Sequence, residues 1–314
     1  MLGYLARRLA MTVPTLLLVG VTVFVMMRLV PGDPVLVMLG DAAGEAEIAD
    51  MRAALGLDRK LPVQFALWLS RVAVGDLGAS ITNGQPVLGL ILDRFQVSAA
   101  IVLVAVAVAA LIAVPLGLLA AWKQNSTADL AIVTGATVLV SVPSFWLGLL
   151  LLLLFGLRLG WLPVVGFVPF SENFAAALSF LVLPIVTLIM IEIGVLTRMS
   201  RAAAIEVLRL EYVTHARAKG LPESRVLLRH VLPNAFAPTW TLIGLILGNL
   251  LGGIAVLETV FTLPGLGRLL VDGIFARDYP VVQGCLLFIA LIYVLVNLVV
   301  DLMYPLFDPR VTAE

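Results

Sequence analysis

Cysteine and lysine are scarce in this 314-residue chain, and each scarcity excludes a class of site. Cysteine occurs once, as Cys285 within an apolar run, which excludes an internal disulfide framework and a cysteine-cluster metal site. The three lysines are Lys60, Lys123 and Lys219, and none of them follows a glycine. A phosphate-binding loop needs Gly-Lys-Ser/Thr, so we expect no ATP site of that type on this chain.

Histidines and clustered carboxylates are also too few to build an enzyme active site. His215 and His230 are the two histidines, and both lie in one polar segment outside the apolar runs. A protease within a membrane needs a nucleophile beside a base at membrane depth, and a metal centre needs several ligands together. We therefore predict no catalytic residues, no metal site and no enzyme activity. The net charge of zero gives no reason to expect a nucleic-acid partner.

Apolar sequence is abundant: 61% of the residues are hydrophobic and only 13% are charged. Soluble domains are about half apolar and about a quarter charged, so the excess indicates contact with lipid. A bilayer core about 30 Å thick needs roughly 20 apolar residues per helix. Six stretches meet this length: 9–27, 97–122, 130–157, 173–191 (continuing past Glu192), 231–257 and 279–300. We predict an all-α membrane protein with about six transmembrane helices.

The first apolar stretch is too long for a cleaved signal sequence. Residues 9–27 are uncharged throughout, whereas a signal core is typically about 7–15 residues long. Val30-Pro31-Gly32-Asp33-Pro34 follows instead of a small-residue cleavage site. We therefore assign residues 1–30 to an uncleaved first transmembrane helix.

Basic residues predict the orientation of the chain in the membrane. Seven of them fall in the segment 198–236, namely Arg198, Arg201, Arg209, Arg217, Lys219, Arg225 and Arg229. Because cytoplasmic loops are enriched in Lys and Arg, this segment and both termini are predicted to be cytoplasmic. Residues 31–95 then form an extracytoplasmic loop, with an amphipathic helix over 45–57. That loop is either a cap without chemistry of its own or a docking surface for an external partner.

Glu192 is the one carboxylate well inside an apolar stretch, so it is a candidate functional residue. A secondary transporter would use such a group for ion coupling near mid-membrane. The alternative, which we favour, places Glu192 near the cytoplasmic end, in water or paired with Arg198.

The segment 206–234 predicts two short helices around a glycine. Val207, Leu210, Val213 and Arg217 fall at helical spacing, and Gly220 is suited to end that helix in a left-handed conformation. Pro222 suits the first turn of a second helix, which Pro233 is expected to end. The next membrane helix is then expected to start near Pro238. These residues alone leave two readings open: an elbow that docks on another protein, or a basic hairpin at the lipid surface.

The same segment resembles the "EAA" loop of ATP-binding-cassette (ABC) importer permeases. Thr214-His215-Ala216 occupies its start, Gly220 its glycine and His230-Val231-Leu232-Pro233 its end, with the Glu, the first Ala and the Ile of the motif replaced. The runs 216–220 and 232–235 resemble the dipeptide/oligopeptide/nickel branch. So do Pro31-Gly32-Asp33-Pro34, Gly75-Asp76-Leu77-Gly78, Pro143-Ser144-Phe145-Trp146-Leu147, Gly160-Trp161-Leu162-Pro163, Leu263-Pro264-Gly265-Leu266-Gly267-Arg268 and Arg277-Asp278-Tyr279-Pro280.

The resemblance implies a type I ABC importer fold in a bacterial inner membrane, with a core permease domain over 96–310 and a cytoplasmic coupling segment over 198–236. It implies four kinds of partner: a second homologous permease, two ATPase subunits or domains, an extracytoplasmic substrate-binding protein and the lipid bilayer. It implies no cofactor on this chain, because ATP and Mg²⁺ belong to the ATPases. The cargo would be short peptides, or a related solute such as glutathione or a nickel chelate. The alternative is a secondary transporter or membrane scaffold without an ATPase.

The resemblance also assigns two groups of site residues. ATPase coupling falls to Glu211, Tyr212, Thr214, His215, Ala216, Arg217, Ala218, Lys219, Gly220, Leu221, Leu232, Pro233 and Asn234. An external gate or turn falls to Pro264, Gly265, Gly267, Arg268 and Asp278, although a mere loop between two helices remains the alternative there.

Overall fold

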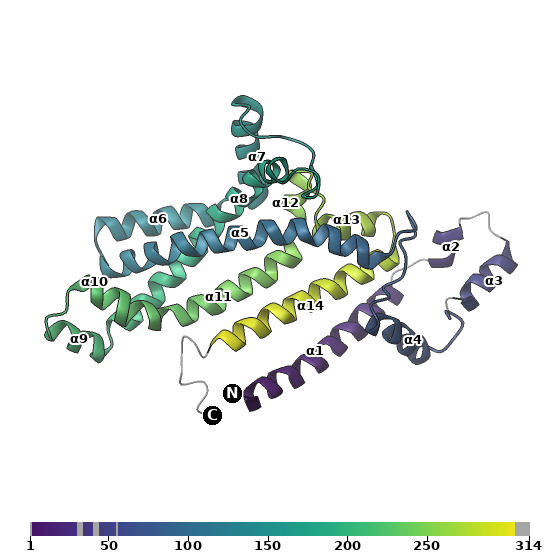
Figure 1. Ribbon diagram of the computed structural model, residues 1–314, viewed down its shortest axis with the longest axis horizontal. Coiled ribbons are helices and arrows are strands. Elements are labelled where there is room, and N and C mark those ends of the chain that lie inside the picture. The colour runs from purple at the N-terminus through teal and green to yellow at the C-terminus, as the bar shows by residue number, and fades with distance from the viewer. Residues whose placement is uncertain (1, 30–33, 40–43, 55, 305–314) are drawn as a thin grey trace.

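The computed structural model describes residues 2–29, 34–39, 44–54 and 56–304. Within these residues the regular structure is helical, apart from one isolated antiparallel bridge between Ala79 and Pro86. Five long segments form the bundle in Figure 1: α1 (Leu2–Leu29), α5 (Val87–Trp122), α8 (Phe174–Leu208), α11 (Leu232–Gly253) and α14 (Tyr279–Met303). An α-helix satisfies its own backbone hydrogen bonds, which is the condition for crossing lipid.

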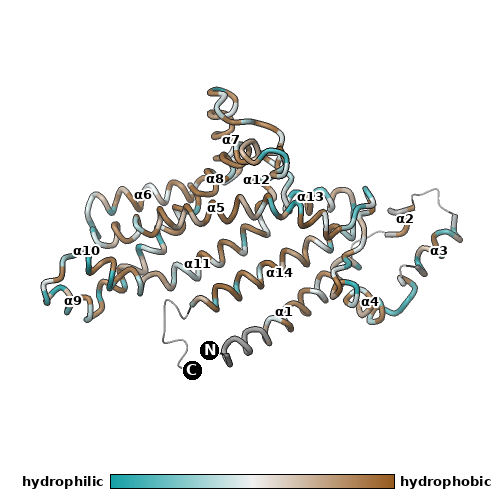
Figure 2. The backbone as a smooth tube through the Cα atoms, viewed as in Figure 1, coloured by the Kyte–Doolittle hydropathy of each residue, from teal (hydrophilic) through white to brown (hydrophobic). Residues whose placement is uncertain are grey.

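The apolar segments match the predicted spans in number. Five helical segments are long and apolar enough to cross a membrane, and a bent pair makes a sixth if it is counted as one span. In Figure 2 hydrophobic residues dominate the middle of the bundle, whereas hydrophilic residues gather at the end that carries α9 (Glu211–Ala218) and α10 (Glu223–Val226). The prediction of an all-α protein with about six apolar spans is confirmed.

The third predicted span is not one straight helix. It consists of α6 (Thr127–Ser141), α7 (Ser144–Leu151) and the π-helix η1 (Leu152–Arg158), with a bend of 94° between residues 141 and 144. Pro143 causes the break, because proline disfavours helical backbone in the residue before it, and Val142 is extended there. As a result α7 leaves the bundle at the top of Figure 1.

The fifth span begins earlier than expected, because neither Pro233 nor Pro238 ends a helix. Residues Glu223–Gly253 run as one continuous apolar segment through α10, the π-helix η2 (Leu227–Val231) and α11. Pro233 falls in the first turn of α11, where a missing N–H costs little. The wider turn of η2 precedes it, and such single π turns are tolerated within α-helices. The expectations of a stop at Pro233 and a start near Pro238 were therefore wrong.

The segment between α1 and α5 contains α2 (Pro34–Leu39), α3 (Glu45–Ala54) and α4 (Leu61–Ala73). The predicted helix 45–57 is α3, which ends at Ala54, three residues earlier than expected; Leu55 lies outside the described residues. The rings of Phe65 and Trp68 on α4 pack within 6 Å of Phe24 on α1. Because α5 already begins at Val87, its helix includes the last residues of the predicted loop 31–95.

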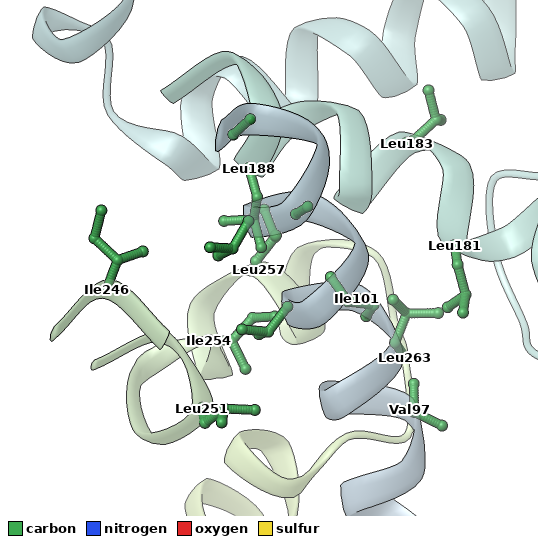
Figure 3. Packing of buried hydrophobic residues seen from close by; sticks show 14 of the residues in the cluster. Val97, Ile101, Leu181, Leu183, Leu188, Ile246, Leu251, Ile254, Leu257 and Leu263 are labelled. Atoms are coloured by element: carbon green, nitrogen blue, oxygen red, sulfur yellow. The ribbon is translucent and has the colours of Figure 1, made fainter. Parts of the chain in front are cut away.

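The main core lies between α5 and α8, with α11, α12 (Ala255–Val260) and the loop after it packed against them. Figure 3 shows part of this core, with Val97 and Ile101 of α5 beside Leu263 and Ile254. Glycines let α11 approach α14 closely: a Cβ at Gly248 would lie 2.6 Å from the Tyr293 ring. Small residues are used in this way where membrane helices pack.

Candidate functional site

The predicted elbow is present and turns at Gly220. Residues 211–231, comprising α9, α10 and η2, are called the elbow below. Gly220 has φ +77°, its N–H donates to Arg217 O at 2.9 Å, and the Leu221 N–H donates to Ala216 O at 3.3 Å. These two bonds form a Schellman motif, which satisfies carbonyls at the end of a helix and needs a residue in the left-handed region. The prediction that glycine ends this helix is confirmed.

The elbow rests on the ends of the long helices through an apolar cluster, called the anchor below. Its buried members come from α5 (Leu118, Ala121), α8 (Ala203, Ala204, Val207), the elbow (Val213, Ala216, Val226, Leu227, Val231) and α11 (Ala235). Apolar side chains packed at interior density transmit displacement, because such packing is hard to compress. The elbow is therefore joined mechanically to three membrane segments at once.

The opposite face of the elbow is open. Most of the coupling residues predicted above are exposed, namely Glu211, Tyr212, Thr214, His215, Arg217, Ala218, Lys219, Gly220, Pro233 and Asn234. Leu221 and Leu232 are half-buried, and Ala216 alone among the predicted residues is fully in the anchor. A residue that sequence reasoning left out of the site, Val213, is also fully buried there. Its helical spacing from Ala216 and Arg217 was the available signal.

Polar contacts brace the elbow from outside. Arg217 Nε and Nη2 donate to the two Glu223 carboxylate oxygens at 2.8 and 3.2 Å, which ties α9 to α10. The His230 carbonyl accepts from Asn234 Nδ2 at 2.8 Å and from Tyr212 Oη at 3.4 Å. Two predicted residues from distant parts of the motif thus meet at one carbonyl on η2.

The second predicted group lies at the other end of the bundle, where the segment 262–268 leads from α12 into the first turn of α13 (Leu266–Phe275). This segment is called the Pro-Gly turn below, and that end of the bundle the turn end. A Cβ at Gly265 would overlap the Glu258 carboxylate, and one at Gly267 would lie 2.7 Å from Ala255 Cα. Both glycines are therefore required by close packing. The turn is part of the packed structure and not a loose loop.

Glu258 organises the Pro-Gly turn, and sequence reasoning did not assign it. Its carboxylate accepts from Ser98 Oγ at 2.5 Å and from the Arg268 N–H at 2.8 Å. Ser98 in turn accepts from the Leu266 N–H at 2.8 Å. The signal that could have found Glu258 is a lone carboxylate in an apolar run directly before a Pro-Gly sequence, because ionisable residues in such runs are retained for a role.

Asp278 ties the start of α14 to the segment before α5. Its carboxylate caps α14 through the Val281 N–H and accepts from Ser80 Oγ at 2.5 Å, Ile81 N at 3.2 Å and Thr82 Oγ1 at 3.0 Å. Burial alone would raise the pKa of Asp278, but these hydrogen bonds outweigh it and hold the pKa below its usual value. The carboxylate is therefore charged, and it fixes two chain segments almost 200 residues apart.

The remaining residues of the predicted turn group have lesser contacts. Arg268 Nε lies 3.7 Å from Asp272 Oδ2 in an exposed pair, and its backbone N–H is what reaches Glu258. Pro264 is half-buried within the turn. The structure thus gathers Pro264, Gly265, Gly267 and Arg268 around Glu258, whereas Asp278 belongs to a separate network at the far end of α13.

Glu192 differs from the expectation of a water-exposed or Arg198-paired carboxylate. It lies within α8, is only 6% exposed, and its Oε2 atom has no hydrogen-bond partner. Arg198 therefore supplies no hydrogen bond to this oxygen in the structure, and burial keeps the side chain from bulk water. Glu192 belongs to neither the elbow nor the turn end.

The elbow and the turn end form two sites joined by α5. Ser98 of α5 belongs to the Glu258 network, whereas Leu118 and Ala121 of the same helix belong to the anchor. Twenty helical residues separate Ser98 from Leu118, which is about 30 Å along the axis. Figure 1 shows the elbow and α13 at opposite ends of the bundle. The arrangement can pass movement from one end to the other, and neither site contains a group of side chains suited to bond-making chemistry.

Two family models of membrane transport proteins match the sequence of this chain. Residues 113–313 match the family model described as the binding-protein-dependent transport system inner membrane component. Residues 1–105 match the model described as the N-terminal part of such a membrane component. The first of these matches covers both the elbow and the Pro-Gly turn.

Full-length relatives agree with the family models. A Brucella suis protein that carries the provisional name peptide transport system permease protein is 40% identical over 311 residues, which is 99% of both chains. The di/tripeptide transport system permease protein of Pseudomonas aeruginosa is 38% identical and the glutathione transport system permease protein of Salmonella choleraesuis 40% identical, again over 99% of both chains. This chain is similar to each of them along its whole length. It belongs to the family of binding-protein-dependent transport system inner membrane components, the permease subunits of ABC importers with the type I fold.

Proposed function

We propose that this permease forms half of a translocation pathway for short peptides and receives its driving force at the elbow. The observation that carries the proposal is the two-sided construction of the elbow. One side is buried in the anchor against α5, α8 and α11, and the other side exposes a mostly polar surface. An element of this kind can sit in a groove on another protein and carry its movement into the membrane helices.

The partner at the elbow is an ATPase subunit. The chain is a transport subunit and not an enzyme, so ATP and Mg²⁺ are handled by ATPase partners. We place one ATPase at this elbow and a second at the elbow of a homologous permease, which completes the pathway. Closure of the two ATPases would draw the elbows together, and the anchor would pass that displacement to α5, α8 and α11. A substrate-binding protein delivers cargo at the turn end.

Short peptides are the cargo that we favour. Relatives of this chain are named for peptide, di/tripeptide, dipeptide and glutathione transport, and all of these solutes contain peptide bonds. The neutral net charge of the chain gives no preference for a strongly charged cargo. A nickel chelate is the remaining class from the wider branch, and uptake measurements separate it from the peptides.

We place the elbow and both termini on the cytoplasmic side of a bacterial inner membrane. The argument is the concentration of basic residues at the elbow, where Arg217, Lys219, Arg225 and Arg229 are all exposed. The turn end, with α3 and α4, then faces outward.

Cysteine labelling tests this orientation. In a background with Cys285→Ala, Asp58→Cys should react with an impermeant thiol reagent in intact spheroplasts, whereas Glu223→Cys should react only after lysis. Both positions are accessible in the structure, since Asp58 is exposed and the Glu223 side chain is 40% exposed. Labelling of Glu223→Cys but not Asp58→Cys before lysis would invert the topology.

Copurification and uptake test the function itself. The tagged chain, purified from native membranes in mild detergent, should bring down a second permease and two ATPase chains. A deletion strain should lose uptake of labelled di- or oligopeptides and regain it with the intact gene. Recovery of the chain without any ATPase, together with undiminished peptide uptake in the deletion strain, would contradict the proposal. Loss of nickel or glutathione uptake alone would leave the ATPase assignment intact and change the cargo.

A further inference from the structure

Glu258 and Asp278 are the two most deeply buried carboxylates that the described part of the chain contains, each with an exposed fraction of 1%. A buried carboxylate is stabilised only if hydrogen bonds or charges replace the water that it loses. For Glu258 the replacements are the Ser98 hydroxyl on α5 and the Arg268 N–H in the first turn of α13. The N-terminus of a helix carries a partial positive charge, so a carboxylate is favoured at that position.

Ser98 closes the network because it binds both partners at once. Its hydroxyl donates to Glu258 Oε1, and its oxygen accepts from the Leu266 N–H, the first residue of α13. The network therefore joins three elements, namely α5, α12 and α13, through three hydrogen bonds between polar atoms. Fully satisfied buried networks of this kind specify one geometry, because any shift leaves a buried group unpaired.

We propose that Glu258 is a positioning residue that locks the Pro-Gly turn and α13 onto α5, so that they move with α5 as one body during transport. The proposal rests on the function proposed above, in which α5 carries displacement from the anchor. Without the lock, α13 would be held to α5 mainly by the apolar contacts of Leu266 with Val87 and Ile91. Apolar contacts resist separation but permit sliding, since they have no preferred direction.

The chain contains its own reporter for this lock. Cys285 on α14 is 0% exposed and packs in one cluster with Leu266 of α13 and with Val87 and Ile91 of α5. It is the single cysteine of the sequence, so no background mutation is needed. A thiol reagent reaches Cys285 only when α13 separates from α5 and α14.

The experiment compares variants of the complex purified with its ATPases and reconstituted in proteoliposomes; labelling is measured with and without a non-hydrolysable ATP analogue, and uptake is measured with ATP. The variants are Glu258→Gln and Ser98→Ala, and the matched control is Thr259→Ala. Thr259 is the neighbour of Glu258, but it is exposed and its hydroxyl bonds only within its own helix, to Ala255 O at 2.8 Å. Two quantities are measured: the rate of maleimide labelling at Cys285, and the amount of peptide taken up per ATP hydrolysed.

A locked α13 predicts that wild-type Cys285 stays unreactive in both nucleotide states. Glu258→Gln should raise the labelling rate by about tenfold or more, and Ser98→Ala by a smaller factor, because each removes hydrogen bonds to a buried group. Both variants should lower the peptide-to-ATP ratio at equal amounts of assembled complex. A mere loss of folded protein would lower uptake and hydrolysis together and leave that ratio unchanged.

Two results would overturn the lock. One is reactive wild-type Cys285 in the ATP-analogue state, because α13 would then move apart from α5. The other is wild-type labelling and wild-type coupling in Ser98→Ala, whether or not Glu258→Gln assembles. Failure of the proposed function is distinguishable from both, because a chain that binds no ATPase still reports the labelling difference between Glu258→Gln and Thr259→Ala.

Discussion

The two ends of this permease are stabilised by different forces. The elbow is held by the apolar anchor and turns at a glycine with open space around it. The turn end is held by buried carboxylates, Glu258 and Asp278, and the two glycines of its Pro-Gly turn, Gly265 and Gly267, have no space for a side chain. Apolar packing leaves a mostly polar surface of the elbow exposed, whereas the turn end buries its carboxylates within the protein. The difference agrees with the proposed function, in which the elbow binds an ATPase while the turn end holds its own geometry.

Glycine substitutions at the two ends of the bundle, Gly265→Ala and Gly220→Val, are expected to have the largest effects on function. Gly265→Ala places a Cβ on the Glu258 carboxylate, so uptake should be lost while ATPase binding at the elbow remains.

In Gly220→Val the added Cβ has no atom within 4 Å, but valine is forced into φ +77°, a strain of about 1–3 kcal/mol. It should reduce ATPase retained in washed membranes by about tenfold, since few residues dominate such contacts.

Gly84→Val is the matched control for Gly220→Val. Gly84 has φ +71° and also has no atom within 4 Å of an added Cβ, but it lies before α5 at the turn end. It should leave ATPase retention unchanged. Full ATPase retention and full uptake in Gly220→Val would show that the elbow is not the coupling device.

A smaller effect is expected inside the anchor. Val213→Ala removes two methyl groups from a fully buried site and should destabilise the elbow by about 1–3 kcal/mol. Amide hydrogen exchange over 211–231 should accelerate, while exchange in the Pro-Gly turn stays the same. Leu228→Ala, at an exposed position of η2, provides the comparison. Equal acceleration in the two variants would argue against a packed anchor.

The turn end should lose stability in acid, because Asp278 holds two of its segments together. The pKa of Asp278 lies below its usual value of 3.8, so its contribution to stability is present above about pH 4 and is lost as the pH falls through the lowered pKa. Asp278→Asn should lower the unfolding temperature by a constant amount between about pH 5 and about pH 8. That difference should shrink below about pH 4. A difference that grows in acid would have the wrong sign for a depressed pKa.

The smallest effect is expected at the ion pair of the elbow. Arg217 and Glu223 are each about 40% exposed, and exposed pairs contribute only about 0.2–1 kcal/mol. Arg217→Ala should therefore leave the fold of the elbow intact, because Gly220 and the anchor hold it. Thermal unfolding of the complex measures this. A large loss of stability would mean that polar contacts, and not apolar packing, secure the elbow.

The sequence predicted features that depend on local patterns. Long uncharged stretches indicated the spans, and Gly220 indicated the end of α9, because left-handed backbone is a local requirement. The helix through Pro233 was missed because the local rule for proline was outweighed by the π turn before it. The bend after Ser141 was missed because a proline in an apolar run can end, bend or continue a span, and tertiary packing decides which.

The polar network at the turn end could not be predicted for a different reason. Ser98 and Glu258 are 160 residues apart, and Ser80 and Asp278 are 198 apart. Nothing in the sequence around either member specifies its partner. The Pro-Gly turn was predicted from the resemblance of residues 263–268 to a permease motif, but the need for its glycines depends on the Glu258 carboxylate, which packs against them only in the folded chain.

The helical segment from Glu223 to Gly253 is continuous, so the second half of the elbow and α11 are joined without a hinge. Thirty-one helical residues span about 46 Å, so a tilt of about 5° about the elbow would carry the far end sideways by about 4 Å. That distance is close to the width of a methyl-bearing side chain. Had Pro233 ended the helix, the same tilt would have been absorbed by a hinge. On the proposed function, a small rotation of the ATPase at the elbow would therefore become a larger sideways displacement at the end of α11, close to Glu258.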